Sequence, residues 1–154
     1  MVMNHAPFIS PLTALDVVRD APVIPVIVLH NVAHAVPMAR ALLAGGIRML
    51  EVTLRTPAAL ECIAAIAREV PDAVVGAGTV RSASDARSAS HAGARFLVSP
   101  GLTAAVAQAS RDVKLPLLPG VATASEIMQA QEAGFSALKF FPALQAGGLA
   151  MLKA

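Results

Sequence analysis

The 154-residue chain has little of several things that define whole classes of protein. Its one cysteine, Cys62, excludes an intramolecular disulfide framework and a multi-cysteine metal site, and it favours a reducing, cytoplasmic compartment. Five phenylalanines, with no tryptophan or tyrosine, are too few to stack nucleic-acid bases, and a formal charge of +2 is too small for a phosphate-backbone footprint. Nucleic acid is therefore not an expected partner.

Long apolar runs and dense charge are also missing. The apolar runs end within a few residues, whereas a membrane-spanning helix needs about 20 apolar residues in a row. The N-terminus lacks the basic stretch and long apolar core of a signal peptide. Charged residues make up 14% of the chain and hydrophobic residues 56%, the reverse of the balance in disordered proteins. We expect one folded domain with no membrane partner.

What is present is a repeat of short apolar runs, rich in Val, Ile and Leu, that is typical of buried parallel strands. Successive runs begin about 20 to 26 residues apart, and Ala-rich amphipathic segments lie between them. A strand followed by a helix at this spacing predicts an α/β fold with a parallel sheet. The six predicted strands are residues 23–29, 47–52, 73–76, 95–98, 115–118 and 136–140.

Helix start and stop signals lie between these runs. Thr56 before Pro57 predicts an N-cap followed by a first-turn proline. Residues 82–85 and 123–126 fit the capping-box pattern. Pro37 is compatible with the first helix only in its first turn. Three glycines follow predicted helices, where a left-handed residue is expected: Gly45, Gly93 and Gly134.

Two architectures use such a repeat: the open doubly wound sheet and the closed eight-stranded TIM-type (β/α)8 barrel. The chain contains neither the dinucleotide motif G-x-G-x-x-G nor a Walker-type phosphate loop, which weakens the nucleotide-binding form of the open sheet. Eight units of about 23 residues would need roughly 180 residues, whereas this chain stops just inside its sixth helix. The residues therefore predict either a six-unit open sheet or a single barrel domain, residues 1–154, that apparently lacks the last two units.

Polar residues at the carboxyl ends of the strands are the functional candidates in a β/α repeat. Glu51 lies inside an apolar run, where an ionised carboxylate is costly unless it is paired. It is either half of a structural salt bridge, to Arg48 or Arg55, or a functional acid. Arg55 is either an ordinary surface residue or a bidentate clamp for a substrate carboxylate.

The third and fourth predicted strands end in residues that suit close approach of a ligand. Gly76 and Gly78 either let a ligand reach the backbone or form a tight turn that requires positive φ. Thr79 follows them and offers a hydroxyl group. Pro100 belongs to a Pro-Gly pair after the fourth strand, which alone is weak evidence because such pairs are common in turns.

Lys139 is the most informative residue, because it stands alone in an otherwise apolar strand and lysine is among the least often buried residues. It is either an end-of-strand lysine that reaches solvent or a desolvated amine, neutral often enough to attack a carbonyl and form a Schiff base. Phe140 and Phe141 would provide an apolar wall beside such an amine.

These strand-end segments, in this order, resemble the KHG/KDPG aldolases, the class I aldolases that act on 2-dehydro-3-deoxy-phosphogluconate and 4-hydroxy-2-oxoglutarate. The resemblance runs from about residue 22 to the end of the chain. Each motif alone is weak, but six in the same order and spacing are highly specific. The matching segments are 22–28 (PVIPVIV), 45–56 (GGIRMLEVTLRT), 74–80 (VVGAGTV), 99–103 (SPGLT), 119–126 (PGVATASE) and 139–143 (KFFPA).

The resemblance implies an eight-stranded β/α barrel, usually a homotrimer, that needs no metal or cofactor and takes a small 2-keto acid as substrate. It implies that Lys139 is the Schiff-base lysine and that Glu51 is the general acid and base. The substrate contacts that it implies are Arg55 for the carboxylate, together with Thr79, Pro100 and Phe141.

The implied reaction is cleavage of 2-dehydro-3-deoxy-6-phosphogluconate to pyruvate and glyceraldehyde 3-phosphate, and also of 4-hydroxy-2-oxoglutarate to pyruvate and glyoxylate. The family holds the substrate phosphate with loops of the seventh and eighth units, and no residue here can be assigned to that task. Two alternatives stay open. One is a truncated, non-catalytic fragment stabilised by self-association, and the other is a pyruvate aldolase or oxaloacetate decarboxylase without a phosphate site.

Overall fold

The computed structural model describes residues 11–154, so the first ten residues of the predicted domain lie outside the described part. Short helices and parallel strands alternate along the described chain. The elements are α1 (Ala14–Arg19), β1 (Val26–Ile27), the 3-10 helix η1 (Val32–His34), α2 (Ala35–Ala44), β2 (Met49–Thr53), α3 (Ala59–Glu69), β3 (Val74–Gly78), α4 (Ala83–His91), β4 (Leu97–Ser99), α5 (Ala104–Asp112), β5 (Leu117–Val121), α6 (Ala124–Glu132), β6 (Lys139–Phe140) and α7 (Gly148–Lys153).

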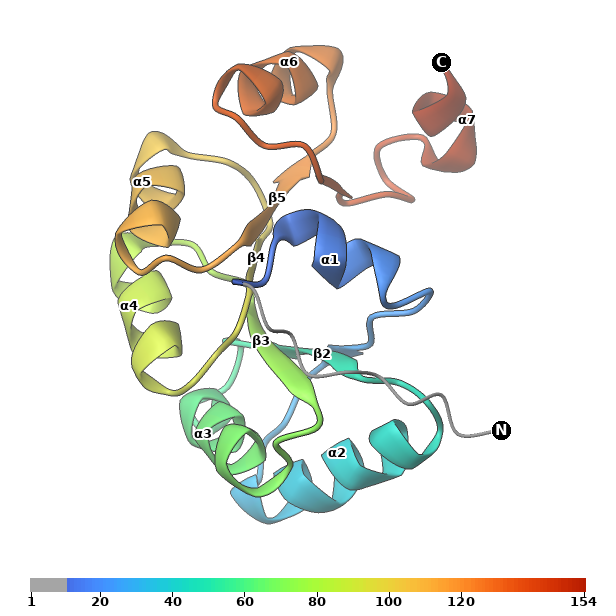
Figure 1. Ribbon diagram of the computed structural model, residues 1–154. Helices are drawn as coiled ribbons and strands as arrows, with labels where there is room; N and C mark the ends of the chain where they lie inside the picture. The colour runs from blue at the N-terminus through green and yellow to red at the C-terminus, as the bar shows by residue number, and fades with distance from the viewer. Residues whose placement is uncertain (1–10) are drawn as a thin grey trace.

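The six strands form one parallel sheet in the sequential order β1-β2-β3-β4-β5-β6. The sheet curls, with α2 to α6 on its outer side (Figure 1). Sequential order and curling are the marks of a barrel rather than of a doubly wound sheet, whose strand order reverses at a switch point. The prediction of an α/β fold with six units of a TIM-type barrel is confirmed.

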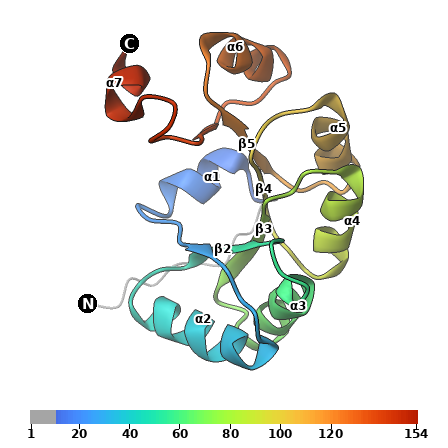
Figure 2. The ribbon, with the colours of Figure 1, turned by 180° about the vertical axis from the view of Figure 1, so that it is seen from behind.

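Alternation along the strands divides the sheet into two apolar faces. Leu50, Val75 and Leu97 face outward and pack with buried residues of the surrounding helices, such as Ile63 and Ile66 of α3. The opposite, concave face carries α1, as both ribbon views show (Figures 1 and 2). A sheet covered on both faces in this way has apolar strands throughout, which explains the continuous apolar runs in the sequence.

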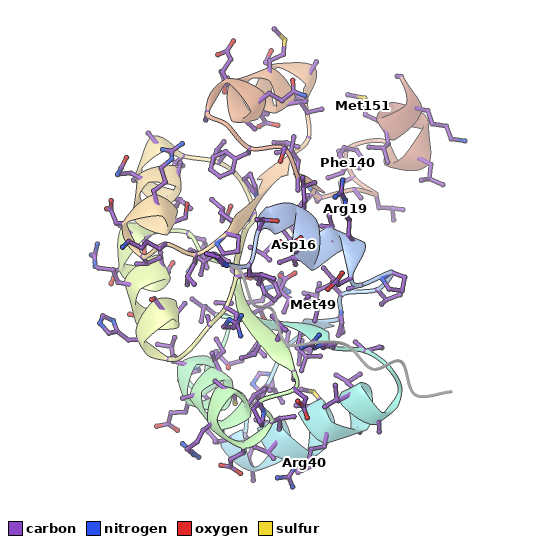
Figure 3. All side chains as sticks on the ribbon, viewed as in Figure 1. Asp16, Arg19, Arg40, Met49, Phe140 and Met151 are labelled. Carbon is purple, nitrogen blue, oxygen red and sulfur yellow. The ribbon has the colours of Figure 1, made fainter. Side chains whose placement is uncertain are left out.

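The floor of the concave face is filled by large side chains. Four fully buried residues lie there: Val17, which belongs to α1, and Met49, Val74 and Phe96, which come from the sheet or the residue before a strand. Met49 lies beneath α1 in the side-chain view (Figure 3). Met49 and Val74 are the first residues of β2 and β3, and Phe96 directly precedes β4. Helix α1 therefore closes the amino-terminal end of the partial barrel. Space for a site remains at the carboxyl ends.

Two of the three predicted helix N-caps are confirmed and one is wrong. Ser82 and Thr123 are the N-caps of α4 and α6, and α6 has the full reciprocal capping box with Glu126. The prediction for Thr56 is wrong, because α3 begins at Ala59 after an N-cap that has no side-chain hydrogen bond. The Thr56 hydroxyl instead donates to the carbonyl of Leu29, which ties the end of β2 to the loop after β1.

The glycine predictions divide in the same way. Gly93 and Gly134 have φ of 91° and 87°, as predicted for residues that end helices. At the end of α2 the left-handed residue is Gly46, with φ of 83°, whereas Gly45 has φ of −80°. Helix α2 ends at Ala44, with Gly45 as its C-cap, and the left-handed residue lies one position later than predicted. Pro37 lies in the first turn of α2, where the missing N–H costs nothing.

Candidate active site

Glu51 and Lys139, 88 residues apart, meet on the concave face of the sheet. The Nζ atom of Lys139 lies 3.3 Å from Oε1 and 3.4 Å from Oε2 of Glu51. The Glu51 side chain is 5% exposed and that of Lys139 is 25% exposed. The salt-bridge partner of Glu51 is thus Lys139 rather than Arg48 or Arg55, the two candidates that the sequence offered. Arg48 donates through Nε to the carbonyl of Asp72, and Arg55 donates to Thr79.

The register of the sheet explains this meeting. Glu51 is the middle residue of β2, two residues after Met49, so both side chains project from the same face. Lys139 begins β6 and is paired with Gly120 of β5, which places the lysine on the same face of the sheet. The curl of the sheet then brings β2 and β6 toward each other, although neither is hydrogen-bonded to the other.

The two charged groups share the wall of a cavity of about 220 Å³. The other lining side chains are aliphatic: Val18, Ile24, Val26, Val98, Leu118 and Leu138. Charges and hydrogen bonds act more strongly in such surroundings than in water, because few solvent dipoles compete for them. One amine and one carboxylate in an otherwise apolar cavity form an arrangement suited to a small molecule with a polar reacting centre.

Arg55 and Thr79 lie just beyond the carboxyl ends of β2 and β3. The Nε group of Arg55 donates to the Thr79 hydroxyl oxygen at 3.2 Å. Thr79 has φ of 60°, which is costly for a threonine and holds its hydroxyl in place at the end of β3. Because the bond uses Nε, the two terminal nitrogens of the guanidinium keep the fork geometry that a carboxylate needs.

Phe141 lies beside the lysine, and Pro100 lies beside Gly120, the residue paired with the lysine. The ring centroid of Phe141 is 5.1 Å from Nζ of Lys139, within the range of a cation–π contact. Phe140 alternates to the other face of β6, so only Phe141 provides the predicted apolar wall. The carbonyl of Pro100 lies against Gly120, where an added Cβ would be 2.2 Å from its oxygen. Of the six predicted site residues, Arg55, Thr79, Pro100 and Phe141 follow the carboxyl ends of their strands, whereas Glu51 and Lys139 lie within theirs and face each other.

The glycines of the concave face have a different role from the turn that the sequence suggested. Gly76 and Gly78 do not form a turn with positive φ, because both belong to β3 and the positive φ falls on Thr79. Together with Gly120 they lie on the concave face, and each adjoins a group from another strand or loop. Their spacing of two residues was visible in the sequence, but which groups they adjoin was not.

The structure also bears on metal binding, on membrane insertion and on the single cysteine. Among residues 11–154, no cluster of three or more His, Cys, Asp or Glu side chains could hold a metal ion. No helix between residues 11 and 154 has the length and apolar character to cross a membrane. Cys62 of α3 is completely buried, and this burial raises the pKa of its thiol, which suits a core residue rather than a nucleophile.

Comparison with known proteins agrees with this geometry. The family model described as "Aldolase: KDPG and KHG aldolase" matches residues 15–154. The chain is 49% identical over 142 residues to the KHG/KDPG aldolase of Escherichia coli, covering 92% of this chain and 67% of that protein. It is 49% identical over 143 residues to the 2-dehydro-3-deoxy-phosphogluconate aldolase of Pseudoalteromonas atlantica, covering 93% and 66%.

Solved structures give the same result. The 2-keto-3-deoxy-6-phosphogluconate aldolase of Zymomonas mobilis, solved with 3-phosphoglycerate, is 53% identical with a TM-score of 0.85, over 89% of this chain and 65% of that one. The KDPG aldolase of Legionella pneumophila, with pyruvate captured at low pH as a covalent carbinolamine intermediate, is 46% identical with a TM-score of 0.86, over 90% and 67%.

These matches extend over nearly the whole described chain, and the chain spans about two thirds of the length of the relatives it matches. A family match of this extent, at close to half of the residues identical, agrees with the fold and with the grouping of polar residues at the strand ends. The chain belongs to the KDPG and KHG aldolase family.

Proposed function

We propose that this chain is a Schiff-base aldolase that cleaves 2-dehydro-3-deoxy-6-phosphogluconate to pyruvate and glyceraldehyde 3-phosphate, and also 4-hydroxy-2-oxoglutarate to pyruvate and glyoxylate. The observation that carries the proposal is the placement of Lys139 Nζ within 3.4 Å of both oxygens of the buried Glu51, on the wall of an apolar cavity. A nucleophilic amine beside a base is the arrangement that carbonyl chemistry of this kind requires.

Each step uses a group that lies in this arrangement. The neutral amine of Lys139 adds to the 2-keto carbon, and the carbinolamine loses water to give an iminium. Glu51 takes the proton of the 4-hydroxyl group, the bond between the third and fourth carbons breaks, and its electron pair passes to the iminium nitrogen. The aldehyde leaves, the enamine takes a proton at its third carbon from Glu51, and water releases pyruvate and the free lysine.

The remaining site residues bind and orient the substrate in this proposal. Arg55 receives the carboxylate next to the keto group, and Thr79 holds the guanidinium through the hydrogen bond to Nε. Phe141 packs against the reacting carbon chain beside Lys139, and Pro100 contacts the substrate from the loop after β4. A carboxylate anchored next to the ketone fixes which carbonyl face meets the amine.

The setting of the reaction is part of the proposal. We propose a single β/α-barrel domain, residues 1–154, that acts in the cytoplasm as a homotrimer on a small 2-keto acid, without metal or cofactor. The resemblance of the strand-end motifs to the family supports the trimer and the substrate class. The single, buried cysteine supports a reducing compartment.

The direct test is borohydride reduction in the presence of pyruvate, followed by mass spectrometry of the intact chain. We expect a covalent pyruvyl adduct at full stoichiometry, located on Lys139 by peptide mapping. The Lys139→Ala variant should form none. Labelling of that variant to the same extent would contradict the assignment of the nucleophile.

Pyruvate release from a panel of substrates separates the proposed activity from its alternatives. Release from the phosphorylated substrate supports the proposal, with Glu51→Gln lowering kcat by roughly 10²- to 10⁴-fold. Release from oxaloacetate or unphosphorylated aldol substrates alone would favour a pyruvate lyase without a phosphate site. Absence of both trapping and turnover would favour a non-catalytic member of the family.

A further inference from the structure

Gly78, the last residue of β3, has the Glu51 side chain lying directly over its α-carbon. A Cβ atom added at Gly78 would be 2.2 Å from Oε1 of Glu51, 2.6 Å from its Cγ and 2.8 Å from its Cδ. Each distance is well inside van der Waals contact. The space that an alanine methyl group would fill at position 78 is therefore occupied by the Glu51 side chain.

The register of β2 and β3 shows how this comes about. Glu51 is paired with Gly76, and Thr53 is paired with Gly78. The Glu51 side chain thus leans toward the carboxyl ends of the strands. It lies over Gly78, two residues beyond Gly76, with which Glu51 is paired. In that position its carboxylate reaches Nζ of Lys139. The same carboxylate that adjoins Gly78 is the one that pairs with the lysine.

The other two glycines of the concave face adjoin different groups. A Cβ at Gly76 would lie 2.5 Å from ring atoms of Phe96, which is completely buried in the floor. A Cβ at Gly120 would meet the backbone of Pro100. Those neighbours are held by packing or by the main chain. Only at Gly78 is the adjoining group the end of a flexible side chain with a cavity beside it.

We propose that Gly78 is a positioning residue: the missing side chain reserves the place in which the Glu51 carboxylate stands beside Lys139. A methyl group at this position displaces the carboxylate into the cavity and separates it from the amine. Gly78 has no positive φ, so an alanine there needs no unfavourable backbone conformation, and we expect the variant to fold. The effect on turnover rests on the proposed function, whereas the displacement of Glu51 does not.

The kinetic test is a double-mutant cycle. Gly78→Ala should lower kcat at least tenfold in the wild-type background and have no further effect in the Glu51→Gln background, because the group through which it acts is then already disabled. Gly76→Ala is the matched control on the same strand and face. It should lower the thermal midpoint through Phe96, and its effect on kcat should be the same factor in both backgrounds.

A second cycle needs no activity. The coupling between Glu51 and Lys139 is measured by urea unfolding of Glu51→Gln, Lys139→Met and the double variant, first with Gly78 intact and then with the Gly78→Ala substitution added to every chain. We expect coupling in the first background and its loss in the second. Equal coupling in both backgrounds, no coupling in either, or an undiminished effect of Gly78→Ala on kcat in Glu51→Gln would overturn the proposal. A wild-type chain that traps no pyruvate would reject the proposed function alone, since the unfolding cycle still decides the role of Gly78.

Discussion

At the scale of single residues, the site keeps groups that stability alone would not select. A largely buried ion pair such as Glu51–Lys139 loses much of its attraction to the cost of removing both charges from water. Apolar residues of similar volume would serve the core at least as well. Thr79 adds to this cost with its positive φ. Unfavourable local choices on one face and at one end of the sheet indicate selection for chemistry rather than for packing.

Arg55 supplies a residue-scale prediction. Arg55→Lys keeps the positive charge but loses the planar fork and the Nε donor that reaches Thr79. We expect KM for the 2-keto acid to rise roughly 10- to 100-fold, the equivalent of one charge-assisted hydrogen bond, with a smaller change in kcat. Steady-state kinetics measure both values.

Arg40 provides the matched control for that substitution. It is exposed on the outer side of α2, away from the concave face (Figure 3). Arg40→Lys makes the same chemical change and should leave KM unaltered. An equal rise in KM for both variants, or no rise for Arg55→Lys, would contradict the proposed contact with the substrate carboxylate.

At the scale of secondary structure, side-chain caps begin most of the helices around the barrel. Thr13, Ser82, Thr103 and Thr123 each accept a hydrogen bond from a backbone N–H in the first turn. Short helices depend on such caps, because four N–H groups at each start have no partner within the helix. The α3 helix lacks one, because its N-cap is Ala58, whose side chain has no hydrogen-bond acceptor. Extensive burial of its apolar face stabilises it instead.

The capping box of α6 leads to a pH-dependent prediction. The Glu126 carboxylate accepts hydrogen bonds from the backbone N–H groups of Ala122 and Thr123, and these lower its pKa. A pKa that is lower in the folded state stabilises the fold at neutral pH, and this contribution is lost as the pH falls through the folded pKa. Urea unfolding across acidic pH should therefore show a smaller loss of stability in Glu126→Gln than in wild type.

Two comparisons sharpen that test. Asp16 forms the same kind of box at α1 and its pKa is also lowered, so the Glu126→Gln variant should keep part of the slope. Thr123→Ala should cost about 1 kcal/mol at neutral pH, as should Thr103→Ala, whose helix has Val106 at the third position. Only the Thr123 substitution should also change the slope with pH. Identical slopes for the two variants would contradict this assignment.

At the scale of the whole molecule, the described part of the chain is a partial barrel with two sheet edges. Strands β1 and β6 each have a neighbour on one side only within residues 11–154. Apolar side chains are exposed near both: Val23, Val26 and Val28 along β1, and Leu144, Leu149 and Leu152 after β6. No residue of α7 is buried, and this helix stands apart from α6 in both ribbon views (Figures 1 and 2). Edges and apolar patches of this kind favour association.

We therefore expect the 154-residue chain to self-associate as its concentration rises, measured by sedimentation velocity. Replacing both Leu149 and Leu152 by lysine should weaken the association, because charge on α7 opposes burial of that surface. Met128→Lys places a lysine at another exposed apolar position, on α6, and is the control for added charge. Equal effects of the α7 and α6 variants would assign the association to net charge rather than to α7.

The order of strands and helices, the two-sided apolar character of the sheet and the site candidates were determined by local sequence patterns. Buried parallel strands are continuous apolar runs, and a charged residue inside one is conspicuous wherever the strand lies, as Glu51 and Lys139 show. The predicted strands agree with β1 to β6 except for shifts at their ends. Strand ends depend on pairing with neighbours, which no local pattern contains.

Only the tertiary structure decided which of these residues meet. Glu51 pairs with Lys139, 88 residues away, rather than with either nearby arginine, because the curl of six strands brings β2 and β6 together. Likewise, Gly78 looks like a turn residue in the sequence, and its closeness to Glu51 follows from the register of β2 and β3. Residue type and alternation are local properties, whereas contacts across a barrel depend on where every intervening strand lies.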